Sequence, residues 1–149
     1  MRSVVLDNEA VQALTDASSP KHRVVVAHLA GVVARRRRGR VAEVVVPTAV
    51  RVEAAWDRTT PSAAAINRFG IRDHILDSPC ADLAARIQTA TSTGVADAHI
   101  GATVRSLSSS EIVVLTSDPT DIAAVCSPSP VRIVTLRKVC RSEAISPLD

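Results

Sequence analysis

VVLDNEAV, residues 4–11, joins two sequence patterns at a single acidic residue. The apolar run SVVL, residues 3–6, is typical of a strand that is buried on both faces. After Asp7, the segment NEAVQALTD places Ala10 and Leu14 on one face of a helix. Asp7 therefore stands where a buried strand is expected to end and a helix to begin.

The same alternation of apolar runs and helical patterns continues along the 149 residues. Strands are predicted at 3–6, 43–46, 71–76, 112–116 and 131–136. Helices are predicted at 8–16, 22–38, 49–58, 62–69, 80–90, 96–107 and within 117–126. Strands that alternate with helices predict an α/β domain with a mainly parallel sheet.

The helix at 49–58 carries an apolar stripe in its sequence. Thr48 is a plausible N-cap for this helix. Ala49, Val52 and Trp56 are expected to share its buried face, with Glu53 at the border of that face.

Composition excludes several classes of function. One Trp, one Phe and no Tyr leave almost no aromatic platform for base stacking. Cys80, Cys126 and Cys140 lack the close spacing of a zinc or redox motif, so reduced thiols and a cytoplasmic location are expected. No signal peptide is expected, because the strand pattern begins within a few residues of Met1. The longest apolar run, residues 24–34, is too short to span a membrane.

Basic charge is concentrated in RRRRGR, residues 35–40, within a chain of net charge +3. The arginines of this segment are Arg35, Arg36, Arg37, Arg38 and Arg40. Such a cluster can bind RNA phosphates. It can equally be a solvated helix end, since cations complement the helix dipole there and Gly39 suits the position after a helix.

Four carboxylates stand at comparable places in the predicted elements. Asp7 and Asp118 follow predicted strands, Glu53 lies on a helix flank, and Asp97 lies in the first turn of a helix. The carboxyl ends of parallel strands meet at one edge of a sheet, where binding sites form. Helix capping and the helix dipole explain each acid equally well when it is considered alone.

Four segments together resemble the PIN-domain family, and most closely the VapC-type toxins of bacterial toxin–antitoxin pairs. These segments are VVLDNEAV, VVPTAVRVEAAW, VADAHIGATV and IVVLTSDPTDIAAV. The resemblance covers almost the whole chain in the family's order. It implies a single PIN-like domain over residues 1–149, with a basic tail from about 137. It also implies a three-layer α/β/α sandwich around a mainly parallel sheet of four to five strands.

The resemblance further implies a catalytic acidic quartet of Asp7, Glu53, Asp97 and Asp118. Asp7, Asp97 and Asp118 would hold the metal, and Glu53 would orient or deprotonate the attacking water. Oxygen ligands without His or Cys select hard dications, so Mg²⁺ or Mn²⁺ is expected.

Five neighbouring residues are secondary to the quartet. Asp121 matches a position where many such toxins keep another acid, although its place in a first helical turn is an equal explanation. Thr116 and Ser117 are expected to support the carboxylates by hydrogen bonds. Asn8 replaces the small or hydroxyl residue usual in the family. Glu9 either adds charge to the metal site or points to solvent.

The histidines near these motifs are not expected to act in catalysis. On a helix, His99 would point away from Asp97, which favours a packed or surface role. His74 has no acidic or nucleophilic partner in the sequence.

The function implied is that of a Mg²⁺- or Mn²⁺-dependent endoribonuclease toxin that hydrolyses RNA phosphodiester bonds. We expect a homodimer that binds a cognate antitoxin and does not associate with membranes. We also expect the arginines of residues 35–40 to border the acidic pocket. One alternative is a non-catalytic PIN-fold module that binds RNA or protein. Another is a phosphoacceptor signalling domain, in which Lys138 could be the lysine expected near the last strand. That domain also needs an acceptor Asp at the end of a mid-chain strand, but strand 43–46 is followed by Pro47.

Overall fold

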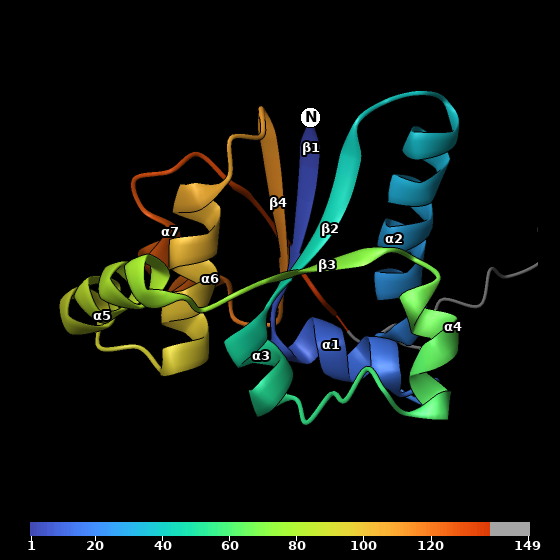
Figure 1. Cartoon of the computed structure of the whole chain (residues 1–149), viewed down its shortest axis with the longest axis horizontal. Coiled ribbons are helices and arrows are strands. Elements are labelled where there is room, and N and C mark those ends of the chain that lie inside the picture. The colour runs from blue at the N-terminus through green and yellow to red at the C-terminus, as the bar shows by residue number, and fades with distance from the viewer. Residues whose placement is uncertain (138–149) are drawn as a thin grey trace, which may run out of the picture.

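Five parallel strands form the central sheet of the computed structural model, which describes residues 1–137 (Figure 1). They are β1 (Arg2–Leu6), β2 (Ala42–Pro47), β3 (Ile71–His74), β4 (Glu111–Thr116) and β5 (Arg132–Thr135). Their order is β3-β2-β1-β4-β5, and every neighbouring pair is parallel. The predicted α/β fold with a parallel sheet is confirmed.

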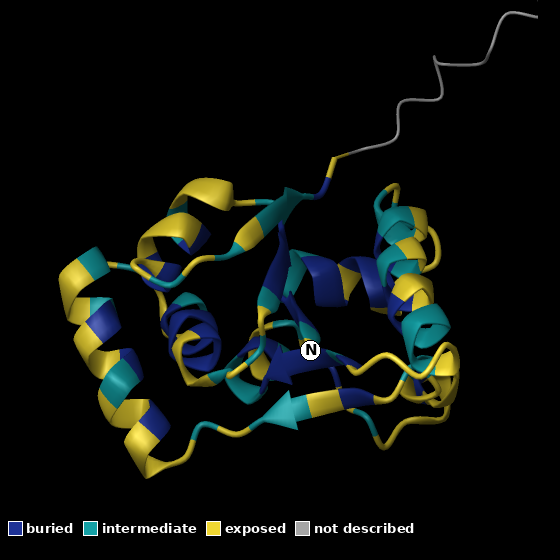
Figure 2. Ribbon diagram, turned by 90° about the horizontal axis from the view of Figure 1, so that it is seen from above, coloured by how far each residue is buried: buried dark blue, intermediate teal, exposed yellow. Residues whose placement is uncertain are grey.

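Helices cover both faces of this sheet (Figures 1 and 2). They are α1 (Asn8–Thr15), α2 (His22–Arg37), α3 (Thr48–Glu53), α4 (Ala64–Asn67), α5 (Ser78–Thr91), α6 (Val95–Ser106) and α7 (Pro119–Cys126). A 3-10 turn, η1 (Pro61–Ala63), precedes α4. Helices α5, α6 and α7 pack together on one side of the sheet, and α1 and α2 lie on the other.

Strands β1 and β4 are neighbours in the middle of the sheet, and their pairing places the residues at their carboxyl ends next to each other. Val4, Val5 and Leu6 of β1 are buried, as is most of β4, because helices lie against both faces. Leu6 pairs with Leu115 in register. The residues that follow these two partners, Asp7 and Thr116, therefore emerge side by side at the carboxyl edge of the sheet.

Helix α3 is shorter than predicted. It ends at Glu53, and Ala55 has a left-handed backbone with φ 52°. Trp56 is buried after this turn, whereas Val52 is 81% exposed. The predicted stripe through Val52 and Trp56 is wrong, because the helical period stops before Trp56. Thr48 is the first helical residue and not the cap.

Two further differences are small. The predicted helix at 62–69 is divided into η1 and α4, and β3 ends at His74, two residues earlier than predicted. The predicted basic tail lies outside the described residues apart from Arg137. Within residues 1–137, no helix is both long enough and apolar enough to cross a membrane.

Candidate functional site

Asp7 connects β1 to α1 at the carboxyl edge of the sheet. Its Oδ1 accepts a hydrogen bond from the backbone N–H of Ala10 at 2.8 Å, and its own N–H donates to the Leu115 carbonyl at 3.2 Å. Burial raises the pKa of Asp7, while hydrogen bonds from the Thr116 hydroxyl and from backbone N–H groups of Ala10 and Ser117 oppose that rise. Asp7 is a helix cap, and it is also a buried acid held in place by the loop that follows β4.

Asp118 has the matching position after β4. Its carboxylate accepts a hydrogen bond from the backbone N–H of Asp121 at 3.3 Å and caps α7. Its own N–H donates to the Thr116 hydroxyl at 2.9 Å. Thr116 is fully buried, so its single hydroxyl connects the loop segments that carry Asp7 and Asp118. Both predicted strand-end acids thus meet at the edge expected for parallel strands.

The pKa of Asp97 is raised, in part by the charges of other acids near it. Asp97 lies in the first turn of α6, and its pKa rises from 3.8 to about 6. Burial is the largest cause, followed by the negative charges of Glu53, Asp121, Asp7 and Asp118. The fold therefore brings Glu53, Asp121, Asp7 and Asp118 within electrostatic reach of Asp97.

These five carboxylates are neither paired with cations nor tightly gathered. In residues 1–137, the ion pairs involve other acids. No three of the five have oxygens that all lie within 4.8 Å of one another in that part of the chain. The negative charges that raise the pKa of Asp97 favour either a proton on this acid or a bound cation. An open set of oxygen donors fits Mg²⁺ or Mn²⁺, because these ions keep several of their waters.

Glu9 and Asn8 each interact with a neighbouring side chain. Glu9 forms an ion pair with Lys21 at 3.3 Å, so its charge is partly neutralised. Lys21 also donates to the Ser117 hydroxyl at 2.9 Å. The amide oxygen of Asn8 accepts a hydrogen bond from Gln12, one turn along α1. Sequence reasoning missed Lys21, because it lies in a turn with no pattern of its own.

The basic segment 35–40 does not border the acids, contrary to the sequence prediction. It lies at the C-terminal end of α2, whose 16 residues span about 24 Å from the end near Lys21. Arg36 donates to the backbone carbonyls of Ala42 and Phe69, at the opposite end of the sheet (Figure 1). Arg35 and Arg36 are half-buried. The exposed arginines of the segment are Arg37, Arg38 and Arg40.

A second basic group lies around Trp56, just after α3. The guanidinium groups of Arg51 and Arg58 lie 5.5 and 4.9 Å from the centre of the Trp56 ring. Both arginines form ion pairs with Asp73, at 2.8 and 3.0 Å. Asp73 thus faces two cations, and Asp57 is a second acid within electrostatic reach of Arg51, so the two cations and two acids nearly balance.

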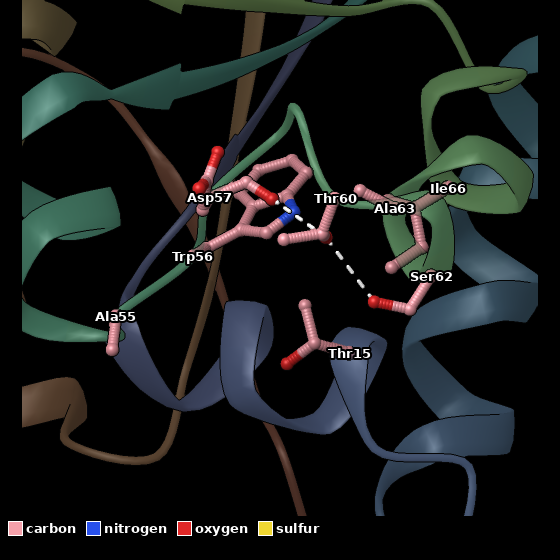
Figure 3. Close-up of a pocket in the computed structure, with 8 residues that line it drawn as sticks. All are labelled: Thr15, Ala55, Trp56, Asp57, Thr60, Ser62, Ala63 and Ile66. Atoms are coloured by element: carbon pink, nitrogen blue, oxygen red, sulfur yellow. Dashed lines mark hydrogen bonds between the residues drawn. The ribbon is translucent and has the colours of Figure 1, made fainter.

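Two hollows lie near α3. The first has a volume of about 210 Å³, and Figure 3 shows Trp56, Thr15, Thr60 and Ser62 around it. None of the five carboxylates lines this cavity. The second, of about 430 Å³, has Glu53 in its wall beside residues of α3 and of the start of α6. Of these two hollows, the second adjoins one of the five acids, Glu53.

Comparison with solved structures supports the fold. The chain is similar to a protein chain in the structure of FitAB bound to an IR36 DNA fragment, with a TM-score of 0.55. The match covers 89% of this chain and 94% of that chain, at 19% sequence identity. The fold is PIN-like. The resemblance predicted from the sequence is confirmed at this level, and an identity this low shows the fold alone.

A scan against protein-family models gave no match, and a search of curated proteins gave none either.

Proposed function

We propose that this protein is a divalent-metal-dependent endoribonuclease of the VapC type. One observation carries the proposal: Asp97 has its pKa raised to about 6 by burial and by four other acids that converge on it from separate elements. Holding such charges together is unfavourable without a cation. A hard dication held by these oxygens suits hydrolysis of a phosphodiester.

The acids have separate roles in this proposal. Asp7, Asp97 and Asp118 hold Mg²⁺ or Mn²⁺, directly or through water. When bound, the ion lowers the pKa of a coordinated water and offsets the charge of the phosphate. Glu53 is exposed at the end of α3, where it orients or deprotonates the attacking water.

Thr116 and Ser117 position the acids. The Thr116 hydroxyl and the Ser117 backbone N–H both lower the pKa of the Asp7 carboxyl and so favour its charged form. Asp121 contributes negative charge to Asp97 from the first turn of α7.

RNA is the proposed substrate, and the basic side chains support this choice. Lys21 lies against Ser117, and Arg51 of α3 pairs with Asp73 of β3, as does Arg58 after that helix, so these cations lie at the carboxyl side of the sheet. Arginine and lysine bind the RNA backbone without reading bases. Arg37, Arg38 and Arg40 bind RNA further from the point of cleavage.

A homodimer and a cognate antitoxin are the proposed protein partners, in the cytoplasm. Val52, Ile75 and Val95 are exposed apolar side chains, and two of them line the groove that contains Glu53. An antitoxin that covered this groove would bury apolar surface and block access to the acids.

Cleavage of RNA by the purified protein tests the proposal. Mg²⁺ or Mn²⁺ should support cleavage and EDTA should stop it. Asp97→Asn should lower the rate by at least about 100-fold, since a ligand is lost. The matched control is Asp82→Asn, which removes an exposed acid of α5 and should leave the rate unchanged. Equal rates for the two variants would remove Asp97 from the site.

One contact favours the alternative of a non-catalytic module. Lys21 places a cation against Ser117, next to the loop that holds Asp7, and a lysine there competes with metal. Calorimetric titration with Mn²⁺ separates the two functions. Absence of binding, together with retained RNA affinity, would favour the non-catalytic module.

A further inference from the structure

A second group of possible metal ligands lies apart from the five carboxylates. His74 ends β3, Cys80 lies in the first turn of α5, and His99 lies in α6. Within residues 1–137 these three side chains offer ligand atoms that all lie within 4.8 Å of one another. Helices α5 and α6 pack against each other, and β3 leads into α5 (Figure 1). The end of β3 and the start of α5, which are close in sequence, therefore meet α6 at this point.

The spacing of the two imidazoles fits metal coordination. His74 Nδ1 and His99 Nε2 lie 3.4 Å apart. Ligands bound tetrahedrally at zinc distances lie about 3.3–3.6 Å from one another. Small movements of the Cys80 side chain would complete three corners of such a tetrahedron.

Burial affects these groups in opposite ways, since it favours neutral imidazole but raises the pKa of the Cys80 thiol and so opposes the thiolate. His99 is fully buried and Cys80 is nearly so, while His74 is half-buried. Burial lowers the pKa of His74 below its usual value, which favours its neutral form near pH 7. Neutral imidazole is the form that coordinates metal ions. Asp77, beside this group, carries a negative charge that raises the pKa of both histidines and so opposes the effect of burial.

We propose that His74, Cys80 and His99 bind a thiophilic transition-metal ion of the Zn²⁺ class, in a site separate from the carboxylates. Thiolate and imidazole ligands select such ions over Mg²⁺ or Mn²⁺. Binding releases the thiol proton of Cys80. The half-exposed side of His74 leaves the fourth position to water.

Two hydrogen bonds oppose this site and limit its affinity. The Thr103 hydroxyl lies 3.2 Å from His74 Nδ1, the nitrogen that would bind the ion. His99 Nδ1 accepts the backbone N–H of Ala49 at 3.3 Å, so in the metal-free protein the ring proton lies on Nε2, facing His74. Coordination through Nε2 moves this proton to Nδ1 and breaks the Ala49 bond. Metal-bound histidines normally donate from their other nitrogen, and such partners contribute about 10–100-fold in affinity. The site should be weaker than ordinary structural zinc sites by about this factor.

The bound ion would join β3, α5 and α6. His99 lies two residues after Asp97 on α6, so the ion would stabilise the helix that presents the central acid of the other site. The site does not depend on RNA cleavage.

Cobalt titration tests the proposal, because Co²⁺ bound to a thiolate gives a charge-transfer absorption band. The protein used carries Cys126→Ala and Cys140→Ala, which leaves Cys80 as its one thiol. We expect one equivalent of Co²⁺ to produce the band and Zn²⁺ to displace it. Absence of the band would overturn the proposal, since the two imidazoles would then be a hydrogen-bonded pair without metal.

Two further variants show whether the ion binds where proposed. His74→Ala, at a half-exposed position, should weaken Zn²⁺ binding by at least about 10-fold without unfolding the chain. Asp97→Asn should retain the band, because the carboxylate site is separate. A band that persists unchanged in His74→Ala, or that is lost in Asp97→Asn, would overturn the assignment.

Discussion

The Thr116 hydroxyl accepts a hydrogen bond from the backbone N–H of Asp118 at 2.9 Å, and the same hydroxyl lowers the pKa of the Asp7 carboxyl. Thr116 is fully buried at the end of β4. Thr116→Val keeps the shape and removes the hydroxyl that acts on both acids. RNA cleavage should fall by about 10–100-fold because both acids lose their support. The free energy of unfolding should fall by about 1–3 kcal/mol because buried polar groups lose their partner.

Single-turnover cleavage and urea unfolding measure these two effects. Thr116→Ser keeps the hydroxyl and should retain most of the activity. A valine variant as active as the serine variant would show that the hydroxyl does not organise the acids.

The raised pKa of Asp97 predicts how stability depends on pH in the absence of metal. Below pH 3.8 Asp97 is protonated in both the folded and the unfolded chain. Between 3.8 and about 6 only the folded chain keeps the proton, so this group lowers stability as pH rises through that window. Above about pH 6 the loss is complete.

Asp97→Asn removes this penalty. Without metal, the variant should be more stable than the parent by about 1 kcal/mol at pH 7.5, since solvent screens a half-buried carboxylate. The difference should vanish near pH 4. Thermal unfolding at the two pH values, in EDTA, measures it. A variant that is less stable at both values contradicts the electrostatic explanation.

The positions of the strand-end acids could be predicted from the sequence because the carboxyl ends of parallel strands lie at one edge of the sheet. Residues 3–6 and 112–116 are continuous apolar runs, so both were recognisable as buried strands, and β1 and β4 are neighbours. Asp7 follows the first run directly, and Asp118 follows the second after one residue, Ser117. Their common edge therefore follows from the strand pattern.

Features that depend on long-range packing could not be read in this way. The helical period of residues 49–58 does not reveal that the backbone turns at Ala55. The segment 35–40 has the composition of an RNA-binding cluster, but its distance from Asp7 depends on the direction of α2. The contact between His74 and His99 joins residues 25 apart and leaves no local signal.

Lys21 is predicted to weaken metal binding. Its ammonium group donates to the Ser117 hydroxyl at 2.9 Å, beside the acids, and pairs with Glu9. Lys21→Met should raise the affinity for Mn²⁺ by about 5-fold, which corresponds to about 1 kcal/mol for one nearby charge. Calorimetric titration measures the change. Lys21→Arg keeps the charge and should bind as the parent does; an unchanged affinity in the methionine variant would count against this role.

Gly101 permits close packing between α6 and α7. A Cβ at this position would collide with the Val125 backbone, whose carbonyl carbon would lie 3.0 Å away. Gly101→Ala should therefore cost about 1–3 kcal/mol of stability, since backbone must move. Because α6 carries Asp97 and α7 carries Asp121, cleavage should fall as well.

Gly31→Ala is the matched control for this substitution. Gly31 also lies inside a helix, α2, but a Cβ there meets no atom within 4 Å. Alanine should stabilise that helix by about 0.5–1 kcal/mol. Thermal unfolding distinguishes the two variants, and equal shifts in Tm would contradict the proposed packing role of Gly101.

The exposed arginines at the end of α2 are predicted to bind RNA without taking part in its cleavage. Arg37, Arg38 and Arg40 lie about one helix length from the acids, since the 16 residues of α2 separate the two ends. Replacing all three by Ser removes up to three phosphate contacts. The slope of log affinity against log salt should then fall by about 2 for single-stranded RNA. The cleavage rate at saturating RNA should stay within about 2-fold of the parent, because no acid is disturbed.

Loss of charge alone would also weaken RNA binding, so the control must remove the same charge elsewhere. It replaces three exposed arginines that lie on separate elements: Arg23 of α2, Arg86 of α5 and Arg132 of β5. If the cluster at the end of α2 is an RNA-binding surface, this scattered variant should keep most of the salt dependence. Equal losses in the two variants would show that the segment is a solvated helix end. A large fall in the rate at saturating RNA would instead place these arginines closer to cleavage than the direction of α2 allows.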